Sequence, residues 1–352
     1  MKKLSTLFLL SLSLSLFAVE PTGYYKDAQG KSGATLRSSL ETIITRTDTV
    51  PTYDGLYTAY RTTDINPSNG KIWDMYSNCN FTYQVDENHG INSVECTNYN
   101  REHTSPQSWF ARAAPMVSDL FNVYPTDTKV NAMRSNYPYG EVATVISTSG
   151  NGSKLGSSGF SSYSGTVFEP IDEFKGDLAR TCLYMATRYA SLCQSWGAGA
   201  TVVYGSSLGL TPYSVSLFLK WSRQDPVSAK ETSRNNAVQA VQLNRNPFID
   251  HPELAEFIWG NRSGEIWSLV SAVDEVKITF SISPNPVQGE LTIQSDEANL
   301  TYTIFNLNGQ VLQQNQLNGI RTISVDQLHN GMYLLQLTSG NRKSIQKFIV
   351  NK

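Results

Sequence analysis

The segment NREHTSPQSWF, residues 100–110, decides the fold of this protein, together with DLFNVYPTDTKVNAMRSN, residues 119–136. Glu102 offers a hard oxygen ligand of the kind that Mg²⁺ prefers, and His103 beside it can act as a base near neutral pH. Of the four histidines, only His103 lies in a dense cluster of polar and aromatic residues. Neighbouring residues on a regular strand point to opposite faces, so we expect a strand end or a β-bulge at this pair.

The second segment predicts a helix. Pro125, Thr126 and Asp127 are typical of a helix start, with Thr126 as the capping residue. Asn131 then falls in the second turn, where its amide oxygen could bind the same metal ion as Glu102. The candidate site therefore joins this helix to the preceding Glu-His pair.

These segments resemble the endonuclease I family of exported bacterial nucleases, whose core is the His-Me finger, or ββα-metal fold. The residues that carry the resemblance are Arg101-Glu102-His103, Pro106-Gln107-Ser108-Trp109-Phe110, Asp119-Leu120, Asn122, Pro125, Asn131 and Arg134-Ser135-Asn136. Further blocks extend it over nearly the entire first domain: WDMYSNC (73–79), FEP (168–170), KGDLARTCLYM (175–185), WSRQDPVS (221–228) and RNNAV to NRNPFIDHP (234–252). The resemblance implies an α+β nuclease domain with a ββα-metal finger, decorated by helices and long loops.

The resemblance also implies a role for each residue of the site. In this family the histidine of the Glu-His pair is the general base that activates water, so His103 takes that role. Glu102 and Asn131 become the ligands of one divalent cation, Mg²⁺, with Mn²⁺ or Ca²⁺ as alternatives. The planar fork of arginine matches a phosphate group, so Arg134 is expected to take part in catalysis.

Two further arginines, Arg101 and Arg180, are expected to bind the substrate, and the choice between Arg134 and Arg180 as the phosphate clamp stays open. The chain departs from many relatives at two positions, where Phe121 replaces a histidine and Ser105 replaces a tryptophan. Neither departure touches the expected base or metal ligands. Tyrosines and tryptophans are expected to pack the core and loops rather than to stack on nucleobases.

The start of the chain predicts export. Residues 1–18 combine a Lys2-Lys3 start, a short apolar run and a small residue at Ala18, which is typical of a secretory signal peptide. That run is shorter than the ~20 residues that a transmembrane helix needs, and no other stretch approaches that length. We therefore expect no transmembrane segment once the signal peptide is removed, and we also expect the protein to be a monomer.

The end of the chain has a different pattern. Residues 277–352 contain short alternating runs separated by turn residues, which predicts a small antiparallel β-sandwich. This tail resembles the C-terminal sorting domain of proteins exported by the type IX secretion system, through Ser283-Pro284-Asn285-Pro286, Ile304-Phe305-Asn306, Gly309-Gln310-Val311, Gly331-Met332-Tyr333-Leu334 and Lys347-Phe348-Ile349-Val350. The resemblance implies that outer-membrane secretion machinery is a partner and that the protein is secreted or held at the cell surface.

The domain boundaries that we predict are 1–18 for the signal peptide, 20–265 for the nuclease domain, 266–276 for a linker and 277–352 for the sorting domain. Outside the site, apolar spacing predicts helices at 38–46, 174–192 and 233–245. The Gly/Ser-rich residues 147–166 predict a surface loop.

The four cysteines fall into two pairs. Cys79 and Cys96 lie in polar, turn-rich sequence and are the candidates for a disulfide, which an exported protein can form. Cys182 and Cys193 lie in a helical segment and are expected to be packed thiols.

Composition does not favour a nucleic-acid-binding protein, because the formal net charge is −2 and that class usually carries a basic surface. The predicted function therefore rests on the site. It is a secreted, metal-dependent endonuclease that cleaves DNA, or alternatively RNA, with little sequence preference. The competing hypothesis is a non-catalytic surface protein that binds nucleic acid or adheres through the same domain.

Overall fold

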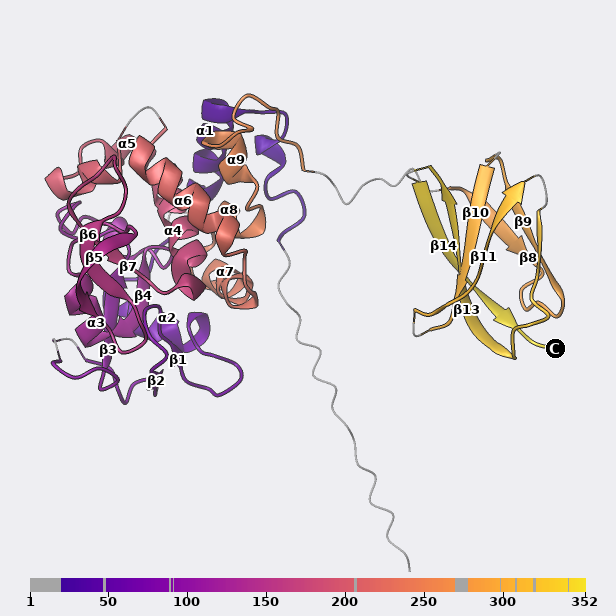
Figure 1. Ribbon diagram of the computed structural model, residues 1–352, viewed down its shortest axis with the longest axis horizontal. Helices are drawn as coiled ribbons and strands as arrows, with labels where there is room; N and C mark the ends of the chain where they lie inside the picture. Colours follow the sequence, from indigo (N-terminus) through magenta and orange to yellow (C-terminus); the bar gives the residue numbers. More distant parts are fainter. Residues whose placement is uncertain are drawn as a thin grey trace, which may run out of the picture. The chain divides into compact units, whose positions relative to one another are not determined.

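The computed structural model describes residues 20–352 apart from 47–48, 89, 91, 206–207, 270–277, 298, 308, 319–320 and 341. Contacts within the chain divide it into two compact units, the first ending at Leu269 and the second beginning at Val270 (Figure 1). The predicted signal peptide and most of the predicted linker lie outside the described residues. No helix in the described ranges is long and apolar enough to cross a membrane.

The first unit is built around one buried helix, α4, which spans Lys175–Arg188 and has no exposed residue. It packs against α1 (Gly33–Thr45), α6 (Pro212–Gln224) and α8 (Pro247–Asp250). The other described helices are α2 (Gly55–Thr63), α3 (Thr128–Arg134), α5 (Ala190–Cys193), α7 (Ala229–Gln242) and α9 (Leu254–Ile258), with 3-10 turns at Lys26–Ala28, Met116–Ser118, Asp172–Phe174 and Ala198–Val202.

The helices predicted at 38–46 and 233–245 are present as α1 and α7, and both begin earlier than predicted. A capping box explains the start of α7, since Ser228 and Glu231 each accept a hydrogen bond from the other's backbone N–H. The helix predicted over 174–192 is interrupted. α4 ends at Arg188 and α5 begins at Ala190.

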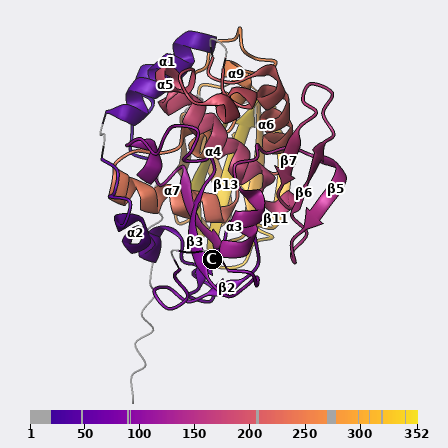
Figure 2. The same ribbon diagram turned by 90° about the vertical axis from the view of Figure 1, so that its left-hand side faces the viewer.

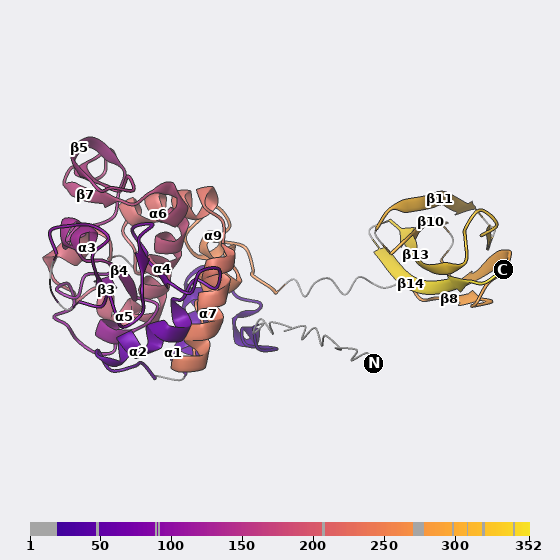
Figure 3. The ribbon, with the colours of Figure 1, turned by 90° about the horizontal axis from the view of Figure 1, so that it is seen from below.

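The strands of the first unit form small antiparallel sheets. β1 (Ile72–Trp73) pairs with β2 (Asn80–Phe81), β3 (Tyr99–His103) pairs with β4 (Val123–Asp127), and a third sheet contains β5 (Val142–Thr148), β6 (Lys154–Ser158) and β7 (Thr166–Glu169). Figures 2 and 3 both place the third sheet at an edge of this unit.

The third sheet corrects the prediction of a surface loop at residues 147–166. This stretch contains the end of β5, the β5–β6 turn, all of β6 and the start of β7. Gly156 shows why the glycine and serine content wrongly indicated a loop. A Cβ at this position would lie 2.1 Å from the carbonyl oxygen of Thr144. The glycine permits close backbone approach between paired strands and does not mark a loop.

The second unit is an antiparallel β-sandwich, as predicted. Its sheets have the strand orders β11-β10-β13-β14 and β12-β9-β8. The strands are β8 (Phe280–Ser283), β9 (Glu290–Ser295), β10 (Asn299–Phe305), β11 (Val311–Asn318), β12 (Thr322–Ser324), β13 (Gly331–Ser339) and β14 (Arg342–Val350). Alternate residues, such as Leu335 and Leu337, enter a core shared by both sheets.

Candidate active site

β3, β4 and α3 form a continuous ββα unit that carries most of the predicted site residues. β3 and β4 pair in a regular antiparallel register, with Glu102 opposite Tyr124 and His103 opposite Val123. His103 is the last residue of β3, so the structure has the expected strand end and no bulge at this pair. β4 leads directly into α3, and the helix packs beside β3.

The cap of α3 differs from the prediction. Asp127, not Thr126, is the N-cap, and its Oδ1 accepts hydrogen bonds from the backbone N–H groups of Lys129 at 2.8 Å and Val130 at 3.0 Å. Thr126 still belongs to β4, where its hydroxyl donates to Asp74. The capping role therefore falls to the carboxylate that lies at the helix start, which satisfies two N–H groups without intrahelical partners.

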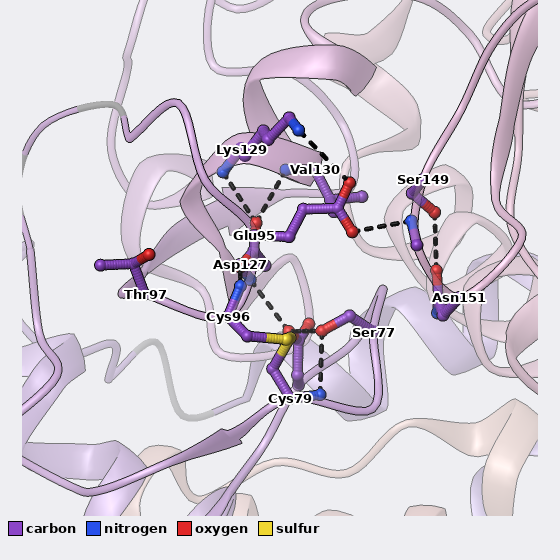
Figure 4. Close-up of a disulfide and its surroundings, with 12 residues drawn as sticks. Ser77, Cys79, Glu95, Cys96, Thr97, Asp127, Lys129, Val130, Ser149 and Asn151 are labelled. Atoms are coloured by element: carbon purple, nitrogen blue, oxygen red, sulfur yellow. Dashed lines mark hydrogen bonds and ion pairs between the residues drawn. A yellow bond between two sulfur atoms is a disulfide. The ribbon is translucent and has the colours of Figure 1, made fainter.

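A disulfide joins the loop before β3 to the segment that precedes β2, and it lies beside the start of α3 (Figure 4). Cys79 and Cys96 are bonded, with Cα atoms 5.1 Å apart, which confirms the predicted pair. The backbone N–H of Cys96 donates to Oδ2 of Asp127 at 2.7 Å, so the capping carboxylate is bound through both oxygens. Cys182 and Cys193 are free and buried, as predicted.

A polar cavity of about 200 Å³ lies beside the ββα unit. It brings together five of the predicted site residues, which are Arg101, Glu102, His103, Asn131 and Arg134. The cavity is also lined by Tyr53, Tyr57, Asn100, Pro106, Gln107, Ser135 and Asn136. The tight β4–α3 connection explains why the residues of β3 and α3 meet here.

The imidazole of His103 lies in the cavity wall and is 4% exposed. Its Nε2 is 2.9 Å from the carbonyl oxygen of Val117. A carbonyl oxygen can only accept a hydrogen bond, so Nε2 carries the proton and Nδ1 holds the lone pair. Burial, together with the positive charges of Arg134 and Arg101, lowers the pKa of His103 to about 4. The ring is therefore neutral at pH 7.

The carboxylate of Glu102 is 3% exposed and is held through one oxygen. Its Oε1 accepts a hydrogen bond from the Tyr76 hydroxyl at 2.6 Å and lies 2.9 Å from Nη1 of Arg134. Neither contact uses Oε2. Burial raises the pKa of Glu102 to about 7, although Arg134 and Tyr76 oppose the shift. A bound cation would compensate this carboxylate for its lost hydration.

Asn131 faces β3 from α3. Its Nδ2 donates to Oδ1 of Asn100 at 2.7 Å and to the carbonyl oxygen of Arg101 at 3.3 Å. Both acceptors require the amide nitrogen, so they fix the orientation of the amide group. The amide oxygen is therefore the atom that can meet a ligand in the cavity.

Arg134 is buried behind Glu102 and is only 1% exposed. Its Nη1 donates to the carbonyl oxygen of His103 at 2.7 Å, and its Nη2 donates to that of Thr104 at 2.6 Å. With the ion pair to Glu102, these bonds fix the end of β3 and the direction of the carboxylate. The geometry thus favours a positioning role over the phosphate contact expected from the sequence.

Arg101 lines the cavity and is held by aromatic rings. Its guanidinium carbon lies 3.6 Å from the ring centroid of Tyr53 and 4.6 Å from that of Tyr57. Its Nη1 donates to the carbonyl oxygen of Tyr53 at 2.7 Å and lies 3.2 Å from Oδ1 of Asp54. A positive charge is therefore fixed in the cavity wall.

Arg180 is not part of this site, which corrects the prediction that it binds the substrate. It lies on α4, is fully buried and does not line the cavity. Its Nη2 donates to Glu231 at 2.8 Å and its Nη1 to the carbonyl oxygen of Asp225 at 2.8 Å. A guanidinium enclosed in this way cannot reach a phosphate. The residue type suggested binding, but the type alone does not reveal burial.

The sequence did not reveal three contacts that define the site. The ring of Tyr53 is stacked on His103, with centroids 5.9 Å apart and an interplanar angle of 26°. The hydroxyl of Tyr76 binds Glu102, and the carbonyl oxygen of Val117 fixes the tautomer of His103. Tyr76 falls in the block WDMYSNC, the one sequence signal that pointed toward this region.

The ββα unit and its polar cavity belong to a chain that also carries a β-sandwich tail. The chain belongs to the endonuclease I family, since the family model described as Endonuclease I matches residues 32–253. A second model, described as Secretion system C-terminal sorting domain, matches residues 281–351. The protein is therefore secreted or located at the cell surface.

Individual proteins that are similar to this chain are also named as nucleases. The chain is 35% identical over 248 residues to an extracellular ribonuclease of Bacillus amyloliquefaciens, covering 67% of this chain and 78% of that protein. It is 32% identical over 249 residues to an extracellular ribonuclease of Bacillus subtilis (strain 168), with the same coverage. It is also 27% identical over 135 residues to an extracellular deoxyribonuclease of Aeromonas hydrophila, covering 38% of this chain and 50% of that protein.

Proposed function

We propose that this protein is a divalent-metal-dependent endonuclease that hydrolyses phosphodiester bonds of DNA or RNA at the cavity between β3 and α3. The observation that supports it is the neutral His103, which lines a cavity together with Glu102 and Asn131 and whose Nδ1 holds the lone pair. A base that is unprotonated at pH 7, beside oxygen ligands, is what metal-assisted hydrolysis of a diester requires.

The donor set fits a hard cation. Among the described residues, no group of three or more His, Cys, Asp or Glu side chains is arranged to hold a metal ion. The cavity instead offers one carboxylate, Glu102, and one amide oxygen, Asn131, whose orientation is fixed by two hydrogen bonds. Two such ligands leave positions for water and phosphate, as Mg²⁺ prefers, and Mn²⁺ or Ca²⁺ are alternatives. A bound cation would neutralise charge on the phosphate and stabilise the leaving oxygen.

In the proposed reaction, Nδ1 of His103 takes a proton from a water molecule while the water oxygen forms a bond to phosphorus. The bond between phosphorus and the leaving sugar oxygen breaks, that oxygen takes a proton from solvent water, and His103 then releases its proton to solvent. The Val117 carbonyl keeps the proton on Nε2, and the Tyr53 ring limits rotation of the imidazole. The chain thus holds its base in one tautomer and one orientation before substrate binds.

Two arginines support this reaction in different ways. Arg101 contributes a fixed positive charge to the cavity wall, where it favours the approach of a phosphate. Arg134 acts through Glu102, whose carboxylate it orients. We propose Arg101 as the substrate-binding residue and Arg134 as a positioning residue of the catalytic centre.

The substrate is proposed at the level of the phosphodiester backbone. Contacts to phosphate carry no sequence information, so little sequence preference is expected. The two Bacillus relatives are named as ribonucleases and the Aeromonas relative as a deoxyribonuclease. Both RNA and DNA are therefore substrates to test.

The test is cleavage of supercoiled plasmid and of single-stranded RNA by the purified chain, with Mg²⁺, Mn²⁺ or Ca²⁺ and with EDTA. We expect cleavage that requires the metal, and a loss of ~100-fold or more in kcat for His103→Ala, since a general base contributes about that much. His329→Ala, in the other unit, is the matched control and should cleave normally. An intact substrate with every metal, from a protein that still binds the plasmid, would support the non-catalytic binding hypothesis instead.

A further inference from the structure

Tyr137 is the most exposed of the described tyrosines, phenylalanines and tryptophans. All 18 tyrosines lie within the described residues, and Tyr137, at 40% exposed, is the one that is neither buried nor half-buried. Among the described phenylalanines and tryptophans, none is exposed to that extent. Packing within the protein therefore leaves more of this ring uncovered than of any other described tyrosine, phenylalanine or tryptophan.

Tyr137 lies at the edge of the candidate active site. Ser135 and Asn136, the two residues before it, line the cavity together with His103 and Glu102. Ser135 ends α3 with φ at +51°, and the N–H of Tyr137 donates to the carbonyl oxygen of Arg134 at 3.2 Å. Consecutive Cα atoms are about 3.8 Å apart, so the Cα atom of Tyr137 lies one such step from Asn136, which lines the cavity.

The backbone that carries Tyr137 is held on both sides. The proline that follows restricts Tyr137 to extended conformations. Beyond it, the Phe168 N–H donates to the carbonyl oxygen of Pro138 at 2.9 Å, and the Gly140 N–H donates to that of Phe168 at 3.0 Å. Tyr137 is thus fixed between the end of α3 and strand β7. A rigid platform loses little entropy when a ligand stacks on it.

The stretch of sequence around Tyr137 contains few acidic residues. Between Thr128 and Phe168 the sequence contains one acidic residue, Glu141, and three basic ones. Glu141 is engaged by Lys220, whose Nζ lies 2.8 Å from Oε2. The whole chain carries a formal net charge of −2, so this stretch is a local departure from the overall balance. The stretch itself therefore adds little negative charge beside the cavity.

We propose that Tyr137 is a stacking platform for a nucleobase adjacent to the phosphodiester bond held in the cavity, and that it favours single-stranded over duplex substrate. The inference rests on the proposed function, which places the phosphate beside His103. In a duplex the bases stack on one another, whereas in a single strand they can turn outward onto an aromatic ring. Stacking on one ring does not distinguish bases strongly, so it agrees with low sequence preference.

The test measures binding apart from cleavage. In the His103→Ala background with Mg²⁺, a fluorescein-labelled single-stranded oligonucleotide is titrated with protein that carries Tyr137, Tyr137→Ala, Tyr137→Phe or Tyr137→Trp. We expect Tyr137→Ala to raise the Kd by about 5- to 150-fold, which corresponds to the loss of one base–aromatic stack. The Phe and Trp variants keep a ring and should bind within about threefold of Tyr137.

Two controls separate stacking from a structural effect. Leu192→Ala removes a side chain of similar exposure, 41%, outside the cavity and should leave the Kd unchanged. The second control is a series of oligonucleotides, each with one abasic nucleotide at a different position. At one position the abasic nucleotide should raise the Kd of the protein that carries Tyr137. With that oligonucleotide, the proteins with Tyr137 and with Tyr137→Ala should have the same Kd.

The outcomes for the two proposals differ. Equal Kd values for Tyr137 and Tyr137→Ala would overturn the stacking inference, even if the wild-type protein cleaves nucleic acid. A Phe variant as weak as the Ala variant would also overturn it, because the ring would then not be the cause. A wild-type protein that cleaves nothing but loses affinity on Tyr137→Ala would support stacking while the proposed function fails.

Discussion

At the scale of single residues, the surroundings of Glu102 and His103 shift the pKa values of the two groups in opposite directions. Burial raises the pKa of Glu102 to about 7 and lowers that of His103 to about 4. Both shifts favour the neutral form, because a buried charge is costly. Neutral His103 is the form that a general base needs, whereas Glu102 must lose its proton before it can bind a cation. The pH dependence near neutrality should therefore come from Glu102.

We predict that the acid limb of activity reflects competition between protons and the cation at Glu102. Below about pH 7 the apparent metal affinity should fall about tenfold per pH unit, since one proton leaves when one cation binds. Initial rates measured against Mg²⁺ concentration from about pH 5 to 8 check this. Raising the Mg²⁺ concentration should shift the acid limb to lower pH. A limb that stays at one pH whatever the Mg²⁺ concentration would contradict the assignment to Glu102 and point to a group that binds no metal.

At the scale of secondary-structure elements, Asp127 joins the helix, the strand and the disulfide loop. One oxygen of its carboxylate caps α3, and the other accepts the N–H of Cys96. Asn131 lies in the next turn of the same short helix, which has seven residues. A helix of this length is not stable by itself, so its position depends on the contacts at its start.

We predict that the double variant Cys79→Ser/Cys96→Ser loses both stability and metal affinity. The sequence separation of 17 residues implies a loss of about 3 kcal/mol in the free energy of unfolding, because the unfolded chain is no longer closed into a loop. Urea denaturation measures this loss, and metal titration of activity measures the affinity. Dithiothreitol should lower the free energy of unfolding and the metal affinity of the wild-type protein and leave both unchanged in the double variant. Cys182→Ala, at a free cysteine, should keep the response to the reductant.

At the scale of the whole molecule, the chain has two separate hydrophobic cores. The first is made of residues up to Trp267, and the second begins at Ile278. None of the residues that the structure describes belongs to both cores. Each unit therefore buries its apolar side chains without the other, which is the condition for independent folding.

We predict that a chain ending at Leu269 folds and cleaves nucleic acid as the longer chain does. Its thermal transition should match that of the full-length protein. Its kcat on RNA and DNA should agree with the full-length value within about twofold, because the whole cavity lies before Leu269. The export of this shorter chain should fail, since the sorting domain is missing. A first unit that aggregates or melts much earlier than in the full chain would show that the two units depend on each other.

The sequence by itself determined the domain order, the β-sandwich tail, the disulfide pair and the position of the Glu-His pair. These features depend on local patterns, such as alternation along strands, or on a run of residues short enough to be recognised together. The segment from Arg101 to Asn136 carried most of the site for the same reason, since β3, β4 and α3 are consecutive in the chain.

Only the tertiary structure decided which arginines line the cavity, which nitrogen of His103 carries the proton and which described tyrosine is the most exposed. Arg134 and Arg180 are the same residue type on helices, yet one orients Glu102 and the other is enclosed by Glu231. The tautomer of His103 depends on a carbonyl oxygen 14 residues away, at Val117. Burial and hydrogen-bond partners come from contacts between distant segments, so no local pattern encodes them.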